Sequence, residues 1–327
     1  MKKDKRRTLF WVIICFVMVA KAQESSSVFN FIKLPVSSHT AALGGTNISL
    51  IEDDATLVFD NPALLASVSD RTLNLNYMTY MSGSKVASAS FVRILGERHT
   101  LGLNARYFDH GTMDQTTETG EVEGTFSAKD MALSGLYSYS LSDKWVGGAT
   151  AKVLYSKYAE YSSVAVGFDL GINYYNEDTD FSASMVLKNI GVQLASFDEQ
   201  TEHLPFDWQI GITQSIAHAP IRVSLTLVDL TRWSSDYYYN PEGKDGFSKK
   251  LLNHLVIGVD LLPSAQTYLS VGYNFRRANE LKAAGSGHGA GWSFGGGLQL
   301  SRIKLGVAYA KYHLATSSLL FNISYVL

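Results

Sequence analysis

The sequence predicts an all-β protein, a 14-stranded antiparallel transmembrane β-barrel with an N-terminal plug (hatch) segment. Three observations lead to this prediction. Apolar residues alternate with small or polar ones along most of the chain, and the alternating runs are long. The long connections between runs all follow odd-numbered runs, and the connections after even-numbered runs are short. Of the 327 residues, 46% are hydrophobic and only 18% are charged, whereas soluble domains have about 25% charged residues.

The run 163–174 shows the alternation well. One face carries Val166, Phe168 and Leu170, and the other face carries mainly small or polar residues such as Asp169. Strands of soluble proteins average about 5–6 residues, whereas a tilted strand that crosses a bilayer needs about 9–11. The runs in this chain reach the longer length, and many end in aromatic residues, as interfacial girdles do. Packing of these aromatic residues in a soluble core is the alternative.

Fourteen such runs are predicted, at 72–80, 85–94, 98–108, 128–141, 144–156, 161–176, 179–189, 206–217, 220–233, 252–263, 266–277, 289–301, 303–313 and 315–327. The connections after even-numbered runs are short turns, and the long connections 109–127, 190–205, 234–251 and 278–288 all follow odd-numbered runs. An even strand number, short periplasmic turns and longer outer loops are typical of bacterial outer-membrane barrels. A soluble sandwich gives no reason for this asymmetry.

Residues 1–22 are predicted to be a signal peptide. A basic start precedes the apolar run 9–20, and cleavage is expected near Ala22. The chain is therefore expected in the outer membrane of a Gram-negative bacterium. Residues 1–22 hold the one cysteine, six of the 28 basic residues and one of the 30 acidic residues, so the remainder has a net charge of −7. This charge argues against nucleic acid as a partner.

Residues 23–71 precede the strands and are expected to fold into the lumen of the barrel formed by 72–327. Gly44 and Gly45 allow a tight bend, and Asn61 can cap a short helix. The lumen faces of the strands are mostly Gly, Ser, Ala and Thr, which leaves room for such a plug. A periplasmic extension is the alternative.

Three elements of this segment carry a resemblance to a known family. They are Ala42-x-Gly44 with the adjoining Gly45, Asp53-Asp54-Ala55 and Asn61-Pro62-Ala63, and with the fourteen strands that follow they resemble the hatch of the FadL family of outer-membrane proteins. Within that family, the segments 30–45 and 111–130 resemble the PorQ branch, which belongs to the type IX secretion system of the Bacteroidota.

The resemblance implies a non-enzymatic component of that secretion system. Such a barrel would anchor the cell-surface attachment complex of PorZ, PorU and PorV, which processes cargo and joins it to lipopolysaccharide. The alternative is a FadL-type transporter of hydrophobic small molecules. A transporter needs an apolar pocket between the plug and the wall, to which Phe29, Phe31 and Ile32 would contribute.

Few residues of the sequence point to chemistry. Gly-x-Ser-x-Gly, His-Glu-x-x-His and Walker motifs are all missing from it, so we predict no enzyme, no metal and no cofactor. Lys152 and Asp169 fall on the polar faces of neighbouring runs and are expected to form a structural ion pair in the lumen.

One long connection is rich in aromatic residues. Tyr and Trp are frequent at protein interfaces, so this connection is a candidate contact with a partner; anchoring near the lipid headgroups is the alternative. The residues concerned are Trp233, Tyr237, Tyr238 and Tyr239.

Overall fold

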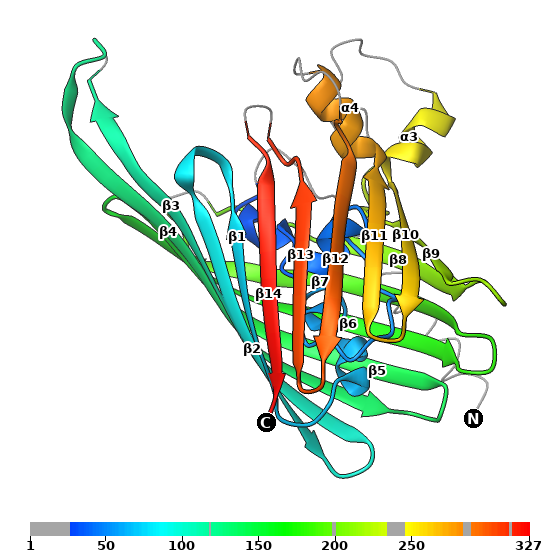
Figure 1. The fold of residues 1–327 in the computed structure, drawn as a ribbon. Coiled ribbons are helices and arrows are strands. Elements are labelled where there is room, and N and C mark those ends of the chain that lie inside the picture. The colour runs from blue at the N-terminus through cyan, green and yellow to red at the C-terminus, as the bar shows by residue number, and fades with distance from the viewer. Residues whose placement is uncertain (1–26, 118, 198–200, 234–245, 284–288, 314–315) are drawn as a thin grey trace, which may run out of the picture.

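The computed structural model describes residues 27–117, 119–197, 201–233, 246–283, 289–313 and 316–327. The predicted signal peptide lies outside the described residues. Fourteen antiparallel strands form a closed barrel, in which β1 (Thr72–Thr79) pairs with both β2 (Lys85–Leu95) and β14 (Ser318–Val326) (Figure 1). Closure pairs the edge of every spanning strand, which a sheet in hydrocarbon requires because no water can satisfy free amides there.

The other strands follow in chain order, and each overlaps a predicted run, so the predicted 14-stranded barrel is confirmed. They are β3 (His99–Thr116), β4 (Val122–Ser140), β5 (Trp145–Tyr158), β6 (Tyr161–Asn176), β7 (Phe181–Ala195), β8 (Asp207–Ser215), β9 (Ile221–Leu227), β10 (Leu255–Ser264), β11 (Thr267–Asn274), β12 (Trp292–Leu300) and β13 (Ile303–Ala310).

The helices are short and lie outside the strand ladders. They are η2 (Asn30–Lys33), α2 (Ser38–Ala42), η3 (Leu57–Phe59), η4 (Pro62–Ser67), η5 (Met81–Gly83), α3 (Phe247–Asn253) and α4 (Phe275–Ala283). Within the described ranges, none of them is long and apolar enough to cross a membrane.

The alternation predicted from the sequence separates an outer face from an inner face. Phe168 and Leu170 on β6 are 53% and 50% exposed on the outside, whereas Asp169 between them is 6% exposed. The short turns and the C-terminus lie at one end of the barrel, and α3, α4 and the β3–β4 hairpin lie at the other (Figure 1). By the usual orientation of such barrels, the end with α3 and α4 is the outer one.

The predicted loop 109–127 is wrong in most of its length, because β3 and β4 continue through it as a two-stranded ribbon. The pairs run from Thr112 opposite Ser127 to Thr116 opposite Val122. Two strands can extend past the membrane because each satisfies the backbone groups of the other. The extension was not predicted because its run of Thr, Gln and Glu lacks the apolar alternation of the other strands.

Several predicted runs extend beyond the strands that they overlap, among them 220–233 and 266–277. The run 220–233 ends as a strand at Leu227. The next residue, Val228, donates its N–H to the carbonyl of His254 at 2.9 Å, which is the last backbone bond beside β10. The run 266–277 ends at Asn274, whose side chain accepts the N–H of Arg277 (2.9 Å) and so begins α4.

Residues 27–71, which we call the N-terminal segment, pack against the inner face of the barrel. At eight inward-facing glycines, the space that a Cβ would take is filled by atoms of this segment. A Cβ on Gly272 would overlap the backbone nitrogen of Gly44, and one on Gly148 would overlap the backbone of Pro62 and Ala63. The glycines are Gly102, Gly148, Gly171, Gly211, Gly258, Gly272, Gly295 and Gly306.

This contact makes a stability prediction. Gly272→Val should lower the free energy of unfolding by about 1–3 kcal/mol or more, the usual cost of overpacking, because the added side chain meets the backbone of Gly44. Gly135→Val is the matched control, since Gly135 faces outward with no atom within 4 Å of its Cβ position. Denaturant unfolding in detergent measures both variants, and equal stability of the two would contradict the close contact.

Candidate functional site between the N-terminal segment and the barrel wall

An apolar belt crosses the inner wall near the outer end of the barrel. Its members are neighbours in the strand register, as in the pairs of Met78 with Leu320 and of Val86 with Phe108. The lumen of a barrel that passes water is polar, so a belt of this kind points to contact with apolar groups. We define the apolar belt as Met78, Val86, Phe108, Ala132, Leu154, Ala165, Ala308 and Leu320.

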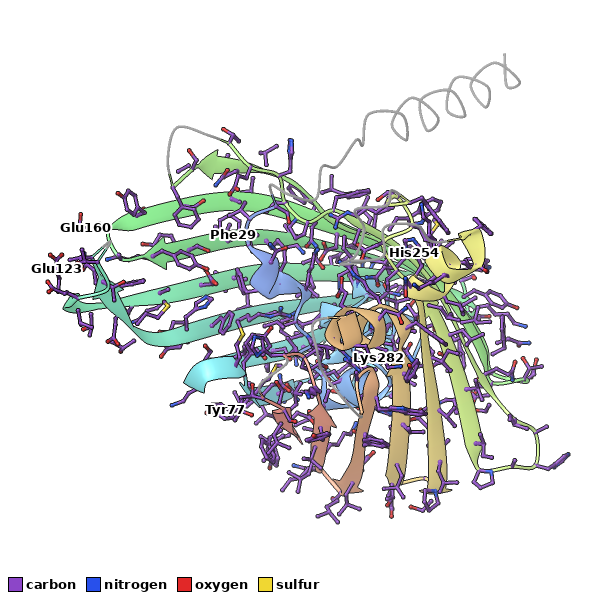
Figure 2. All side chains as sticks on the ribbon, turned by 90° about the horizontal axis from the view of Figure 1, so that it is seen from above. Phe29, Tyr77, Glu123, Glu160, His254 and Lys282 are labelled. Carbon is purple, nitrogen blue, oxygen red and sulfur yellow. The ribbon has the colours of Figure 1, made fainter. Side chains whose placement is uncertain are left out.

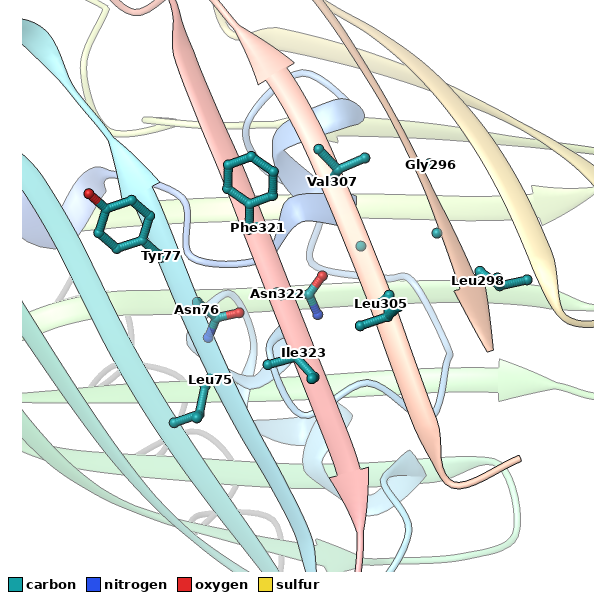
Figure 3. A pocket seen from close by; sticks show the side chains of 12 residues that line it. Leu75, Asn76, Tyr77, Gly296, Leu298, Leu305, Val307, Phe321, Asn322 and Ile323 are labelled. Carbon is teal, nitrogen blue, oxygen red and sulfur yellow. The ribbon is translucent and has the colours of Figure 1, made fainter. Parts of the chain in front are cut away.

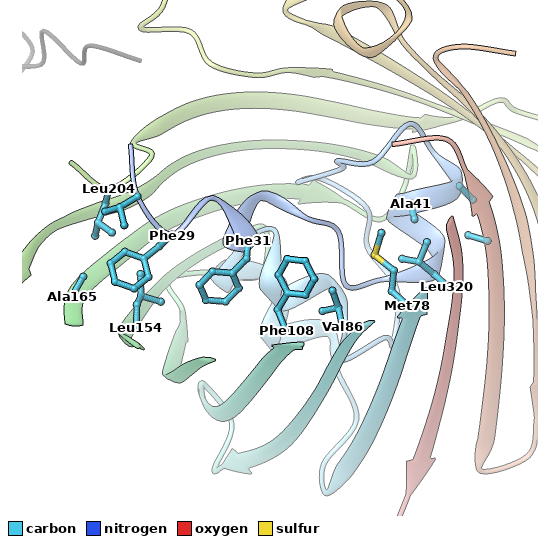
Figure 4. Close-up of a cluster of buried hydrophobic side chains, with 13 residues drawn as sticks. Phe29, Phe31, Ala41, Met78, Val86, Phe108, Leu154, Ala165, Leu204 and Leu320 are labelled. Atoms are coloured by element: carbon cyan, nitrogen blue, oxygen red, sulfur yellow. The ribbon is translucent and has the colours of Figure 1, made fainter. Parts of the chain in front are cut away.

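The first residues of the N-terminal segment cover the belt. Phe29 and Phe31 are 4% and 5% exposed and belong to the same buried cluster (Figure 4). Ile32 is also predicted to contribute to an apolar surface here. It is half-buried and packs at the edge of this cluster, so it contributes less than Phe29 and Phe31. The hydrogen bonds of this stretch to the rest of the chain include the Val28 N–H to the carbonyl of His203 (3.1 Å). Arg106 Nη1 also donates to the carbonyls of Phe31 (3.1 Å) and Leu34 (3.2 Å).

One polar side chain interrupts the belt. Asp130 lies opposite Phe108 in the register and is 2% exposed. Its carboxylate is 2.7 Å from Nε2 of His110 and accepts the hydroxyl of Ser156 at 2.5 Å. These partners satisfy the buried carboxylate, so the belt remains apolar on both sides of it.

Two spaces between the N-terminal segment and the wall are small and largely polar. Two cavities of about 160 Å³ and about 40 Å³ share Arg106, Lys188 and Phe59 in their walls. The Arg106 guanidinium lies 5.2 Å from the centre of the Phe59 ring, and Lys188 Nζ is 3.7 Å from the carboxylate of Asp60. Burial raises the pKa of Asp60, and Lys188 opposes that rise. Spaces of this size and polarity suit water rather than an apolar ligand.

The predicted ion pair of the lumen is confirmed. Lys152 Nζ lies 2.7 Å from Oδ1 of Asp169, and both side chains are almost fully buried. Asn189 supports both partners, since its side-chain oxygen accepts from Lys152 (2.7 Å) and its backbone N–H donates to Asp169 (2.7 Å). A buried pair with such additional hydrogen bonds is a structural element of the wall.

A second buried charge cluster joins the N-terminal segment to the wall. His39 of α2 lies between two carboxylates, with Nδ1 2.9 Å from Glu52 and Nε2 2.9 Å from Asp260 on β10. Arg222 on β9 bonds to both carboxylates, at 2.5 Å to Glu52 and 2.8 Å to Asp260. The Tyr268 ring stacks on the imidazole at 3.6 Å. We call His39, Glu52, Arg222 and Asp260 the charge cluster.

The charge cluster keeps His39 protonated. Burial alone lowers the pKa of His39, but the carboxylates of Glu52 and Asp260 outweigh it and raise the pKa to about 9. The pKa of Glu52 is lowered, because His39 and Arg222 outweigh the opposing effect of burial. At neutral pH two cations and two carboxylates therefore compensate each other across the boundary between segment and wall.

The residues of the hatch motif all lie where the N-terminal segment turns or meets the wall. Gly44 and Gly45 both have φ +104°, which confirms the predicted bend. Asp53 accepts from the backbone and hydroxyl of Ser69 (2.7 and 2.6 Å) and pairs with Lys304 at 2.7 Å. Asp54 accepts the N–H of Thr56 at 2.9 Å, and burial raises the pKa of Asp54.

Asn61 and Pro62 form the third part of the motif. The Asn61 side chain caps η4 by accepting the N–H of Ala63 (2.9 Å) and donates to the carbonyl of Ile48 (2.8 Å), so the predicted cap is confirmed. Pro62 presses its backbone against Gly148. These residues shape the segment and place it on the wall.

The predicted contact loop is described in part. Tyr237, Tyr238 and Tyr239 lie outside the described residues. Trp233 is 36% exposed, stacks on Phe247 of α3 with ring centres 5.9 Å apart, and donates its Nε1–H to Leu230 at 2.7 Å. A contact of these residues with a partner stays a prediction.

A separate hollow of about 630 Å³ lies on the outside of the barrel, over β1 and β12–β14 (Figure 3). Most of the side chains that line it face outward, whereas those of Asn76 and Asn322 are buried, and Gly296 adds no side chain to it. Because it faces the hydrocarbon region, lipid chains have access to it, and it is distinct from the lumen. Its walls include Leu75, Tyr77, Leu298, Leu305, Phe321 and Ile323.

The fold is similar to that of several solved structures, two of which are named as toluene transporters and one as a FadL homologue. The toluene transporter TbuX of Ralstonia pickettii is 12% identical, with a TM-score of 0.57 over 91% of this chain and 98% of that chain. The chain has the FadL-like fold. The toluene transporter TodX of Pseudomonas putida is 14% identical, with a TM-score of 0.57 over 89% and 98%. A FadL homologue of Pseudomonas aeruginosa is 12% identical, with a TM-score of 0.55 over 89% and 98%.

Comparison by sequence, unlike comparison by structure, finds no related protein. No family model matches the chain, and no curated protein matches it. At identities of 12–14%, the likeness to these structures shows the fold alone.

Sequence reasoning missed the charge cluster. Its members come from positions 39, 52, 222 and 260, and nothing in the local sequence relates them. The one available signal was that Arg222 and Asp260 stand at lumen-facing positions of their runs, where most residues are small. An ionisable residue facing the interior of a membrane protein needs a partner, and here part of that partner set is in the N-terminal segment.

The charge cluster makes a pH prediction. Because the pKa of His39 is raised above its ordinary value of 6.5 to about 9, its stabilisation is fully present below pH 6.5 and is lost as the pH rises through 9. His39→Gln should cost about 3 kcal/mol of unfolding free energy at pH 6, the low end for breaking a buried pair. Denaturant unfolding should show a difference in unfolding free energy between wild type and variant at pH 6, and this difference should disappear at pH 10. A difference that stays constant would contradict the raised pKa of His39.

Proposed function

We propose that the protein is an outer-membrane barrel that binds hydrophobic small molecules at the apolar belt and lets them cross. The observation that carries this proposal is the belt itself, an apolar surface on the inner wall beneath Phe29 and Phe31. Transfer of an apolar molecule from water to such a surface gains about 25 cal/mol per Å² buried. The solved structures with this fold include proteins named as transporters of toluene.

In this proposal the N-terminal segment has two parts with different roles. Residues 28–34 form the cover, which apolar packing and a few hydrogen bonds hold on the belt. Residues 38–65 form the fixed part, which the glycine contacts and the charge cluster hold. A ligand that replaces Phe29 and Phe31 on the belt would displace the cover and leave the fixed part in place.

A second candidate is the anchoring role in type IX secretion, with PorZ, PorU and PorV as partners and lipopolysaccharide nearby. The sequence segments that resemble the PorQ branch support it. The β3–β4 ribbon, which rises beyond the rim of the barrel in Figure 1, supports a contact with other surface proteins. An anchor needs no ligand in the lumen, so the two candidates make different predictions.

The transport proposal predicts the effect of a polar residue on the belt. Phe108→Asn should reduce the uptake of radiolabelled toluene and fatty acid about tenfold, because an unsatisfied amide on the binding surface costs at least about 1.4 kcal/mol. Leu136→Asn is the matched control, since Leu136 is equally buried on the inner wall but packs against Leu65 and not against the belt. The assay uses cells that lack their own FadL-type barrels and compares equal amounts of folded protein. Uptake no faster than in cells without the barrel would reject transport of these compounds.

The anchoring candidate has its own test. The tagged chain is purified from native outer membranes in mild detergent, and its partners are identified by mass spectrometry. Stoichiometric recovery of PorZ together with the sortase PorU would support anchoring. Recovery of the barrel alone, with an apolar molecule bound, would support transport and remove the anchoring candidate.

A further inference from the structure

The β3–β4 ribbon leaves a strand edge open outside the membrane. The ladder between β2 and β3 stops at the pair of Lys85 with Asp109, yet β3 continues to Thr116. Beyond that pair, residues 112–116 bond to β4 on one side and, within the described ranges, to no strand on the other. In Figure 1 the ribbon rises past the neighbouring strands.

An open edge presents a row of backbone N–H and C=O groups to which another strand can add. Proteins usually protect such edges with Pro, with Lys or with a bulge. The stretch 112–116 contains neither Pro nor Lys, and its register with β4 is regular from Thr112 to Gln115. The bulges lie at its two ends, between Asp109 and Thr112 and between Gln115 and Thr116. A partner strand therefore has a short regular edge to pair with.

The two faces of the ribbon differ in chemistry. Met113 lies opposite Phe126, and both are half-buried, so one face is apolar. Asp114 lies opposite Thr125, and both are exposed on the other face. Directly opposed side chains on neighbouring strands contribute about 0.2–1 kcal/mol when they match. A strand that suits this edge alternates apolar residues, beside Met113, with basic residues, beside Asp114.

The charge of the ribbon also favours a basic partner. Residues 110–127 include four acidic residues and no Lys or Arg. Glu160, in the next turn at that end of the barrel, adds to this charge, as Figure 2 shows by the labels of Glu123 and Glu160. A field of one sign speeds the approach of the opposite charge and repels like charge, including the phosphates of outer-leaflet lipids.

We propose that the open edge of β3 at residues 112–116 binds an extended segment of a surface protein by strand addition, and that this segment alternates apolar and basic residues. The backbone pairing supplies affinity, and the side chains of Met113 and Asp114 supply specificity for the sequence of the partner strand. This inference concerns a protein contact on the ribbon and does not depend on whether a hydrophobic molecule crosses the barrel.

The test uses the full-length barrel in detergent and a ten-residue synthetic peptide of alternating Lys and Val. Hydrogen exchange should show slower exchange of amides within residues 112–116 when the peptide is bound. The same peptide with every second backbone nitrogen methylated keeps its charge but loses half of its N–H donors, and it should bind at least about tenfold more weakly. Absence of binding, or equal binding of the methylated peptide, would overturn strand addition.

A pair of charge reversals separates the edge from general attraction. Asp114→Lys should weaken the unmodified peptide at least about tenfold. Asp143→Lys is the matched control, since Asp143 is exposed in the short turn at the opposite end of the barrel. Equal weakening by both variants would show that the peptide responds to net charge alone and would also overturn the proposal.

Discussion

The structure depends on the contact between the backbone of the N-terminal segment and the glycines of the inner wall. A side chain on Gly148, Gly171 or Gly272 would occupy space that the segment already fills. Close approach of two backbones excludes water from the contact between them, and each polar group buried there then needs a partner from the segment or the wall. The charge cluster and the cap of Asn61 are examples of such partners.

The same constraint separates the segment into a fixed part and a cover. Around the glycines, the nearest atoms of the segment belong to residues between 38 and 65. The side chains of Phe29 and Phe31 pack in the buried cluster of the apolar belt, and such packing can be replaced by a ligand of similar apolar surface. The proposed transport therefore uses the weaker contact and leaves the stronger one intact.

The barrel was predictable because each spanning strand must alternate, and alternation is visible in the sequence. The ion pair of Lys152 with Asp169 was predictable for a related reason, since both residues stand at inward positions of neighbouring runs. The charge cluster and the apolar belt were not predictable, because the register across strands and the path of the segment decide which residues meet. The extension of β3 and β4 was missed because paired strands outside the membrane need no apolar face.

Hydrogen exchange of the N-terminal segment, measured in the barrel with and without a bound hydrophobic molecule, tests the central claim most directly. With toluene as the probe, the account predicts faster exchange in residues 28–34 and unchanged protection in residues 38–65. Loss of protection throughout the segment would show that the glycine contacts do not hold a fixed part. Unchanged exchange at Phe29 and Phe31 in the presence of bound toluene would show that the ligand does not replace the cover, and would contradict the account.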